Sequence, residues 1–289
     1  MSDQTLTVAS APAMAGPRST ALDLRPLHRG KLAAVLSDSV VLTRRNLLRV
    51  PRQLDWLVGV TIMPIMFLLL FRYIFGGTVQ ATMPPGVSAV NYLVVGILVQ
   101  GIVFGGMNTG LGLAIDAKEG LMDRFRSLPM TRVSVLLGRV LADLALTVFT
   151  TATTLAVGLL VGFRPEAGVL DWAAALGLIL LTAFVMSWIG AAVGLALKTI
   201  EAVNSIGFSL IFPITFVSSA FTRPEFLPSW LRGFAENQPF TLVVDTTRGL
   251  LTGYPEVGNK GWIALAWLLG TLVVMVPLSV WLFERRGRA

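Results

Sequence analysis

The chain has 289 residues, of which 54% are hydrophobic and only 13% are charged, whereas a soluble domain carries about 25% charged residues; an ordinary soluble globular protein is therefore excluded. The net charge of +7 does not indicate nucleic-acid binding, because the lysines and arginines cluster beside apolar segments, as in polytopic membrane proteins. With no cysteine and one histidine, the chain has no disulfides or thiol nucleophiles, and cysteine-ligated or multi-histidine metal sites are excluded.

The start of the chain is rich in Ser, Thr, Ala and Pro. It contains neither a basic start nor an apolar run, so residues 1–30 are predicted to be a disordered cytoplasmic tail rather than a signal peptide. The single histidine, His28, lies in this tail with no serine or carboxylate arranged around it. We interpret His28 as a solvated residue, not a catalytic one.

The next segment, residues 33–51, has the periodicity of an amphipathic helix. Apolar residues fall on one face, and Arg45, Arg49 and Arg52 gather on the opposite face. Arg44 falls near the boundary between the faces, where its long side chain can reach headgroup phosphates. This pattern predicts a helix that lies in the membrane interface.

Six apolar segments follow, and crossing the hydrocarbon core takes about 20 residues of helix. They predict an all-α polytopic membrane protein with six transmembrane helices, at about residues 54–75, 90–114, 133–161, 172–197, 203–221 and 262–283. The glycine-rich second segment is predicted to be a packed interior helix. The loop after the first segment has no lysine or arginine, whereas the loop after the second and both chain ends are basic, which predicts that both termini are cytoplasmic.

The stretch between the fifth and sixth apolar segments has a mixed character. Two half-amphipathic pieces, residues 228–236 and 240–251, are joined at Asn237-Gln238-Pro239. Their length and polarity predict a re-entrant hairpin on the outer side. The non-helical backbone of such a hairpin is tolerated at membrane depth only where protein buries it. We interpret Gln238-Pro239 as the turn between two short helices.

Two ionisable residues lie within apolar segments, where such residues are functional candidates by default. Arg72 lies toward the outer end of the first segment, and its side chain can extend to the interface. Asp143 follows Arg139 by one helical turn, so the two are expected to form an ion pair near the inner interface. We favour these structural interpretations, and the scarcity of intramembrane charge argues against an ion-coupled carrier or a channel.

No phosphate-binding loop of the form G-x-x-x-x-G-K-[ST] occurs in the chain, so any ATP must be bound by a partner, and no cofactor is expected in this chain. The one carboxylate cluster is Asp116, Glu119 and Asp123 at the inner membrane face, where an integral-membrane transferase acting on lipid-linked substrates would hold Mg²⁺. Lys118 and Arg124 interleave with these acids and favour ion pairs over a metal site. The transferase is therefore the alternative, not the preferred, hypothesis.

Four groups of residues carry a resemblance to a known family. They are the proline-containing stretch 64–67 with Phe75-Gly76-Gly77, the run Gly120-Leu121-Met122-Asp123-Arg124-Phe125-Arg126-Ser127-Leu128-Pro129-Met130, the turn Gly162-Phe163-Arg164-Pro165, and Gln238-Pro239-Phe240-Thr241 before Arg248. Through them the chain resembles, over about residues 30–285, the membrane subunit of type-2 ABC exporters of the daunorubicin-resistance class. The family often has Asn-Pro where this chain has Gln238-Pro239, so no role is carried over to that pair.

The resemblance implies a type-2 ABC transmembrane domain over residues 31–289 in a bacterial cytoplasmic membrane, exporting an amphipathic drug, an antibiotic or a lipid. It makes residues 33–51 an elbow helix and makes the cytoplasmic segment between the second and third spans a coupling helix that docks on the ATPase. The implied coupling residues are Asp116, Glu119, Gly120, Leu121, Asp123, Arg124, Phe125, Arg126, Leu128 and Pro129. Apolar members of this set would anchor the helix, while its arginines would pair with acidic groups of the partner.

The partners that the resemblance implies are two copies of an ABC ATPase, which supply ATP and Mg²⁺, and a second permease copy in a homodimer, surrounded by membrane lipids. Aromatic and methionine side chains of the apolar segments would form a hydrophobic and adaptable substrate path. The candidates are Met66, Phe67, Phe104, Met107, Phe212 and Phe216. Such side chains more often face lipid or the core, and nothing in the sequence selects the substrate.

Overall fold

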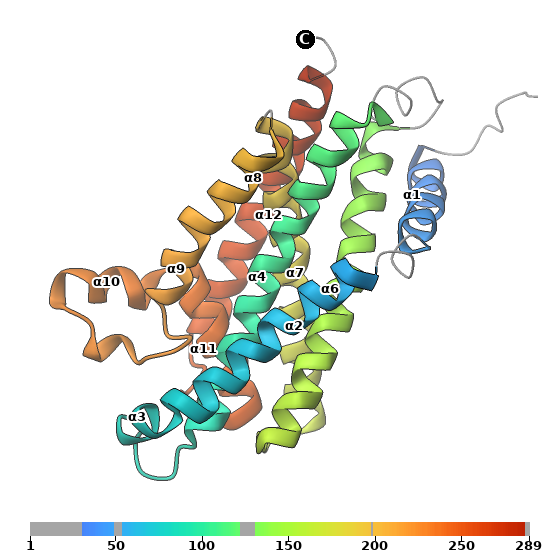
Figure 1. The fold of residues 1–289 in the computed structure, drawn as a ribbon. Helices are drawn as coiled ribbons and strands as arrows, with labels where there is room; N and C mark the ends of the chain where they lie inside the picture. Colours follow the sequence, from blue (N-terminus) through green and yellow to red (C-terminus); the bar gives the residue numbers. More distant parts are fainter. Residues whose placement is uncertain (1–30, 49–53, 122–130, 198, 287–289) are drawn as a thin grey trace, which may run out of the picture.

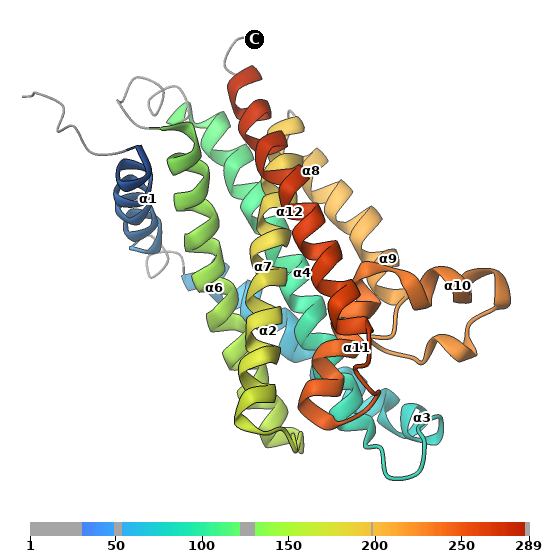
Figure 2. The ribbon, with the colours of Figure 1, turned by 180° about the vertical axis from the view of Figure 1, so that it is seen from behind.

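The computed structural model describes residues 31–48, 54–121, 131–197 and 199–286. Within these ranges all regular structure is helical, which confirms the all-α prediction. The longest helices run side by side in one bundle, which Figures 1 and 2 show from opposite sides. We call the end where the last helix reaches the C-terminus the C-terminal end, and the opposite end, which carries α3 and α10, the hairpin end.

Five helices in the described part of the chain are long and apolar enough to cross a membrane, and they lie at five of the six predicted positions. The first is a composite of α2 (Leu54–Leu70), a π-helical turn (Phe71–Phe75) and α3 (Gly76–Ala81). The others are α4 (Ala89–Lys118), α6 (Arg132–Val161), α7 (Val169–Ala196) and α12 (Lys260–Arg285). A multi-span membrane protein is thus what the helix lengths support.

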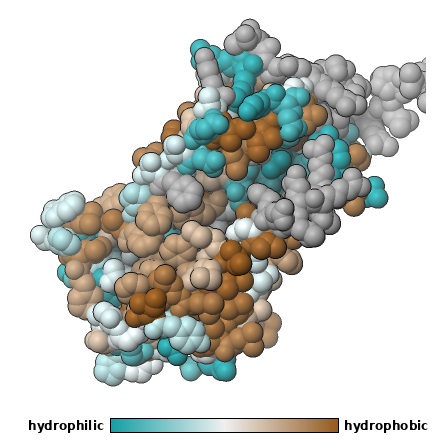
Figure 3. Space-filling model, viewed as in Figure 1, coloured by the Kyte–Doolittle hydropathy of each residue, from teal (hydrophilic) through white to brown (hydrophobic). Residues whose placement is uncertain are grey.

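The outer surface of the bundle is suited to lipid. Large apolar side chains point outward from several helices, including Val58, Ile62, Leu160, Val273 and Trp281. Figure 3 shows hydrophobic residues over much of one face between the two ends, with hydrophilic residues gathered most densely toward the C-terminal end. Soluble monomers rarely expose so many large apolar side chains together.

The fifth predicted span, residues 203–221, is a shorter helical segment in the structure. It consists of α8 (Ile200–Ile206), a π-helical turn (Gly207–Ile211) and α9 (Phe212–Phe216). The helix ends at Phe216, before the end of the apolar run at Phe221. Ser218 Oγ donates to the Thr215 carbonyl and accepts from the backbone N–H of Ala220 at 3.1 Å.

The first span also ends later than predicted. Gly76 and Gly77 were expected to follow its last residue, Phe75, but the helix continues through both glycines to Ala81. Gly76 takes ordinary helical angles, with φ −55° and ψ −39°. Glycine permits a turn but does not impose one, since it also adopts the right-handed helical conformation.

The centre of the bundle is the contact between α4 and α7, and it confirms that the second predicted span is a packed interior helix. Gly106 and Gly110 of α4 face Gly190 and Gly194 of α7 so closely that a Cβ atom on Gly110 would collide with the Gly190 carbonyl, and one on Gly190 with the Gly106 carbonyl. Small residues four apart on both helices let the two backbones touch.

The N-terminal helix α1 (Lys31–Leu47) is packed against the side of α6 in both views of the bundle. Ser39 Oγ donates to the Ser134 carbonyl at 3.4 Å, and Thr43 Oγ1 donates to the Gly138 carbonyl at 3.2 Å. The buried Leu42 sits where a Cβ on Gly138 would be. The helix was predicted over residues 33–51, of which the last part lies outside the described residues.

The predicted pair of short helices before the last span is present as α10 (Ser229–Asn237) and α11 (Pro239–Thr252). Gln238 ends the first and precedes the second, which confirms the interpretation of Gln238-Pro239 as a turn between two helices. Figure 2 shows α11 beside α12, with α10 projecting from the bundle. Most of α11 is buried, whereas α10 exposes Trp230 and Phe234.

Candidate functional site

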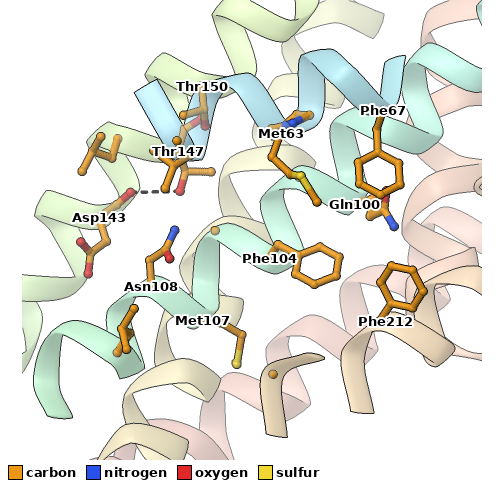
Figure 4. Close-up of a pocket in the computed structure, with 18 of the residues that line it drawn as sticks. Met63, Phe67, Gln100, Phe104, Met107, Asn108, Asp143, Thr147, Thr150 and Phe212 are labelled. Carbon is orange, nitrogen blue, oxygen red and sulfur yellow. Dashed lines mark hydrogen bonds between the residues drawn. The ribbon is translucent and has the colours of Figure 1, made fainter. Parts of the chain in front are cut away.

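A cavity of about 250 Å³ lies between α2, α4, α6 and the α8–α9 segment. Met63 and Phe67 of α2, Phe104 and Met107 of α4, and Phe212 of α9 point toward it in Figure 4. Glycines of α2 and α4 also line it and leave the space open. The volume is close to the lower end of the range for small-molecule sites, about 300–1,000 Å³.

The cavity has one polar side. Asn108 of α4 and Asp143, Thr147 and Thr150 of α6 line it away from the phenylalanines (Figure 4). Thr147 Oγ1 donates to the Asp143 backbone carbonyl at 3.0 Å. Near the aromatic side, Gln100 Nε2 donates to Thr215 Oγ1 at 3.3 Å. A hydrophobic body with a polar end, that is, an amphipathic molecule, matches this arrangement.

The structure brings together four of the six side chains that were proposed from the sequence as a substrate path. Phe67, Phe104, Met107 and Phe212 line the cavity. Met66 instead points outward and is 55% exposed. Phe216 stacks between Phe212 and Phe221, with ring centroids 4.3 Å and 4.7 Å away, and supports the wall from behind.

An ionic cluster lies next to the polar side of the cavity, toward the C-terminal end. Arg139 Nε donates to Asp143 Oδ2 at 2.9 Å, which confirms the predicted pair. The same guanidinium reaches Asp116 on α4, with 3.6 Å between Nη1 and Oδ2. It lies against α4 at Gly112, where a Cβ atom would overlap it. One arginine therefore joins a cavity residue to the last turns of α4.

The predicted coupling residues are only partly described. Glu119 ends α4, Gly120 follows with φ +69°, and Leu121 packs against a buried apolar cluster that includes Leu42 and Leu113. The others of that set, Asp123, Arg124, Phe125, Arg126, Leu128 and Pro129, lie outside the described residues, as do Arg49 and Arg52 of the predicted elbow.

The two remaining elbow arginines are in the described part of α1. Arg44 is exposed. Arg45 borders a small pocket together with Asn46, Asp116 and Arg139.

Where the structure is described, no group of three histidine, cysteine, aspartate or glutamate side chains is arranged to hold a metal ion. Asp116, one of the three proposed metal ligands, is engaged by arginine instead.

A second polar centre, near the hairpin end, was not predicted. Arg248 of α11 is 1% exposed, and its guanidinium lies 3.5 Å from the centroid of the Tyr92 ring on α4. It donates to the carbonyls of Tyr92 at 3.2 Å and Ser219 at 2.8 Å, and pairs with Asp245 at 3.3 Å. Lys260 Nζ contacts the other oxygen of Asp245 at 2.9 Å. This centre fixes α11 to α4 and to the turn after α9.

Arg286, just beyond α12, closes the C-terminal end of the bundle. Its Nη1 donates to the Gly194 carbonyl at 2.6 Å, in the last turn of α7. A cation is favourable there because the carbonyls of a helix C-terminus carry partial negative charge. Burial lowers the pKa of Arg286 from its usual value, yet an arginine stays protonated at any physiological pH.

The long apolar helices and the amphipathic cavity between them define an integral membrane protein with an internal cavity. The chain belongs to the ABC-2 type transporter family, whose model matches residues 38–252. It is 31% identical to the daunorubicin resistance ABC transporter permease protein DrrB1 of Streptomyces coeruleorubidus over 80% of both chains. It is 26% identical to the "Probable doxorubicin resistance ABC transporter permease protein DrrC" of Mycobacterium tuberculosis, over 85% of this chain and 88% of that protein.

Proposed function

We propose that this permease exports an amphipathic drug-like molecule through the cavity between α2, α4, α6 and α9. Two relatives are named for resistance to daunorubicin or doxorubicin. The single observation that carries the proposal is the composition of the cavity wall, which has aromatic and methionine side chains on one side and Asn108, Asp143 and threonines on the other. ATP and Mg²⁺ act through a separate ABC ATPase subunit, as in the family.

We infer the orientation and the assembly from charge and from the family. Basic residues in the stretch 118–132 and at the chain end support a cytoplasmic position for the C-terminal end and for both termini. The exposed apolar face of α1 then lies in the inner interface, where Arg44 meets headgroups. Residues 200–221 complete a sixth crossing, and α10–α11 form a re-entrant hairpin on the outer side.

We further propose that the segment 116–130 docks on the ATPase, with two ATPase copies serving two permease copies. Arg124 and Phe125 are the residues expected to carry the docking. The alternative, a metal-dependent transferase that uses Asp116, Glu119 and Asp123, finds less support because Arg139 occupies an Asp116 oxygen. Family membership also points to a transporter.

Changing Arg124 and Phe125 together to alanine is expected to lower the recovery of the ATPase with the tagged permease at least tenfold, because a buried aromatic and a paired arginine are typical interface hot spots. Co-purification from the native membrane in mild detergent measures this. The matched control is Arg232→Ala with Phe234→Ala on the exposed α10, at the hairpin end. Equal ATPase recovery from both double variants would contradict the docking assignment.

Replacing Gly101 with leucine should weaken drug binding while leaving the fold intact. Gly101 lines the cavity, and a Cβ atom there meets only the Pro64 ring, at an ordinary 3.5 Å. The rest of the side chain would therefore fill the cavity. The affinity for daunorubicin is expected to fall at least tenfold, or about 1.4 kcal/mol.

Quenching of daunorubicin fluorescence by the purified permease measures that affinity, and export from loaded vesicles with the ATPase measures transport. Gly177→Leu on the exposed face of α7 is the control, since a Cβ atom at Gly177 meets nothing within 4 Å. Unchanged affinity in Gly101→Leu would place the drug outside this cavity. Metal-dependent transferase activity in the purified chain without ATPase would support the alternative function.

A further inference from the structure

We propose that Arg139 is the positioning residue that links the α4–α6 connection to the wall of the cavity, so that movement of the connection changes the cavity. The inference rests on the proposed function, because it assumes that an ATPase moves this connection. It goes further by naming the side chains that transmit the movement. The contacts of Arg139, Asp116 and Asp143 carry the argument.

The first part of the argument is where the two carboxylates lie along the chain. Asp116 is in the last turn of α4, directly before the residues that connect α4 to α6. Arg139 and Asp143 lie about two and about three turns into α6, the helix that begins after that connection. The single guanidinium of Arg139 therefore joins the last turn of α4 to the first part of α6, the two helices between which the connection runs. Any displacement of one end relative to the other changes the Arg139–Asp116 distance.

The second part is that α4 has a recess for this guanidinium. A Cβ atom on Gly112 would overlap the Arg139 guanidinium, so only a residue without a side chain leaves room for it. Gly112 is one turn before Asp116 on the same face of α4. The guanidinium therefore has a fixed position along α4, beside Gly112, and does not extend into solvent.

The third part is that the other partner of Arg139 belongs to the cavity. Asp143 lines the cavity, and its side chain is 6% exposed, so it depends on Arg139 for its compensating charge. If the connection draws Arg139 toward Asp116, the Asp143 carboxylate loses its closest donor, and the polar side of the cavity gains negative charge. By linkage, a ligand that engages Asp143 also biases the Arg139–Asp116 contact.

The fourth part is that the beginning of α6 is anchored to α1. The hydroxyls of Ser39 and Thr43 on α1 donate to the carbonyls of Ser134, in the first turn of α6, and of Gly138, the residue before Arg139. This anchoring holds the start of α6 against α1. Movement of the connection therefore displaces the end of α4, where Asp116 lies, more than the start of α6.

The chain contains no cysteine, which allows a direct test with the complete permease–ATPase complex. Thr150→Cys places one thiol on the cavity wall, and its rate of alkylation by a maleimide is measured without nucleotide and with ATP plus vanadate. In the otherwise unsubstituted complex the two rates should differ at least about fivefold, the lower end of typical coupling between sites. With Asp116→Asn added, the difference should disappear.

Two further variants separate this role from a merely structural one. Asp116→Glu, which restores a carboxylate within reach of Arg139, should recover the nucleotide-dependent change, and Arg139→Gln should lose it. Glu236→Gln removes an exposed ion pair with Arg232 far from the cluster and should leave the change intact. Each variant is compared at equal amounts of bound ATPase, so a loss of folding or of docking is seen separately.

The outcomes are distinguishable. The ionic link would be overturned, and the proposed function left in place, by a full nucleotide-dependent change when Asp116→Asn is added to Thr150→Cys. The same holds if the complex with Thr150→Cys alone shows no nucleotide-dependent change. Loss of ATPase binding in Asp116→Asn would assign Asp116 to docking and overturn the link as well. An unsubstituted chain that recruits no ATPase would instead contradict the proposed function and, with it, this inference.

Discussion

Adding one methyl group at Gly190 should lower the free energy of unfolding by about 2–3 kcal/mol, near the upper end of the usual cost of overpacking. The Cβ atom of Gly190→Ala would collide with the Gly106 carbonyl oxygen and lie 3.3 Å from the Gly110 nitrogen. All of these atoms are backbone atoms of α4, so no side chain can rotate away. The two helices would have to separate, and they would lose contacts along their whole interface.

Gly177→Ala is a closely matched control for this change. It lies on the same helix, adds the same methyl group and meets nothing within 4 Å. Because alanine favours a helix over glycine by about 1 kcal/mol, the control should be as stable as the unsubstituted chain or slightly more so. Thermal unfolding in detergent, followed by the loss of the monodisperse chromatographic peak, compares the two. Equal stability of Gly190→Ala and Gly177→Ala would show that α4 and α7 are not in backbone contact.

The sequence predicted the long apolar helices well and their ends less well. Runs of about 20 apolar residues are required by the thickness of the hydrocarbon core, so five spans were located directly. The ends depend on local hydrogen bonds that composition does not reveal. Ser218 closes the segment after Phe216 through its own hydroxyl, whereas Gly76 lets the first span continue.

Side-chain chemistry alone predicted only part of the cavity wall. Phe67 lines the cavity, while the adjacent Met66 faces outward, because neighbouring residues in a helix differ by about 100° in direction. Both are suitable for a hydrophobic path, and only the packing of α2 against α4 and α6 distinguishes them. The pair of Arg139 with Asp143 follows from their spacing of four residues, but the contact with Asp116 is between helices and needs the fold.

One contact of Arg248, the pair with Asp245, is predictable from the sequence. Arg248 lies in a mostly apolar segment three residues after Asp245, the spacing at which helical side chains meet. A charged pair inside such a segment predicts a buried ionic contact. The additional partners, the Tyr92 ring and the carbonyls of Tyr92 and Ser219, come from distant parts of the chain and could not be predicted.

Replacing Arg248 with methionine is expected to destabilise the permease even more than the added methyl group at Gly190. Methionine keeps much of the length and volume but leaves the Ser219 carbonyl without its 2.8 Å donor and removes one of the two cations at Asp245. Removing one member of a buried ion pair costs about 3–5 kcal/mol. We therefore expect the folded permease to be recovered from the membrane in strongly reduced amount, with α11 accessible to protease.

A conservative variant and a surface control show whether the guanidinium itself is responsible. Arg248→Lys keeps the charge near Asp245 but cannot serve the Tyr92 and Ser219 carbonyls together, since an ammonium lacks the planar fork of donors; its stability should be intermediate. Arg232→Met removes the exposed pair with Glu236 on α10 and should leave the unfolding temperature unchanged. If Arg248→Met unfolded at the same temperature as Arg232→Met, α11 would be held by its apolar contacts alone, and the buried arginine would not determine its position.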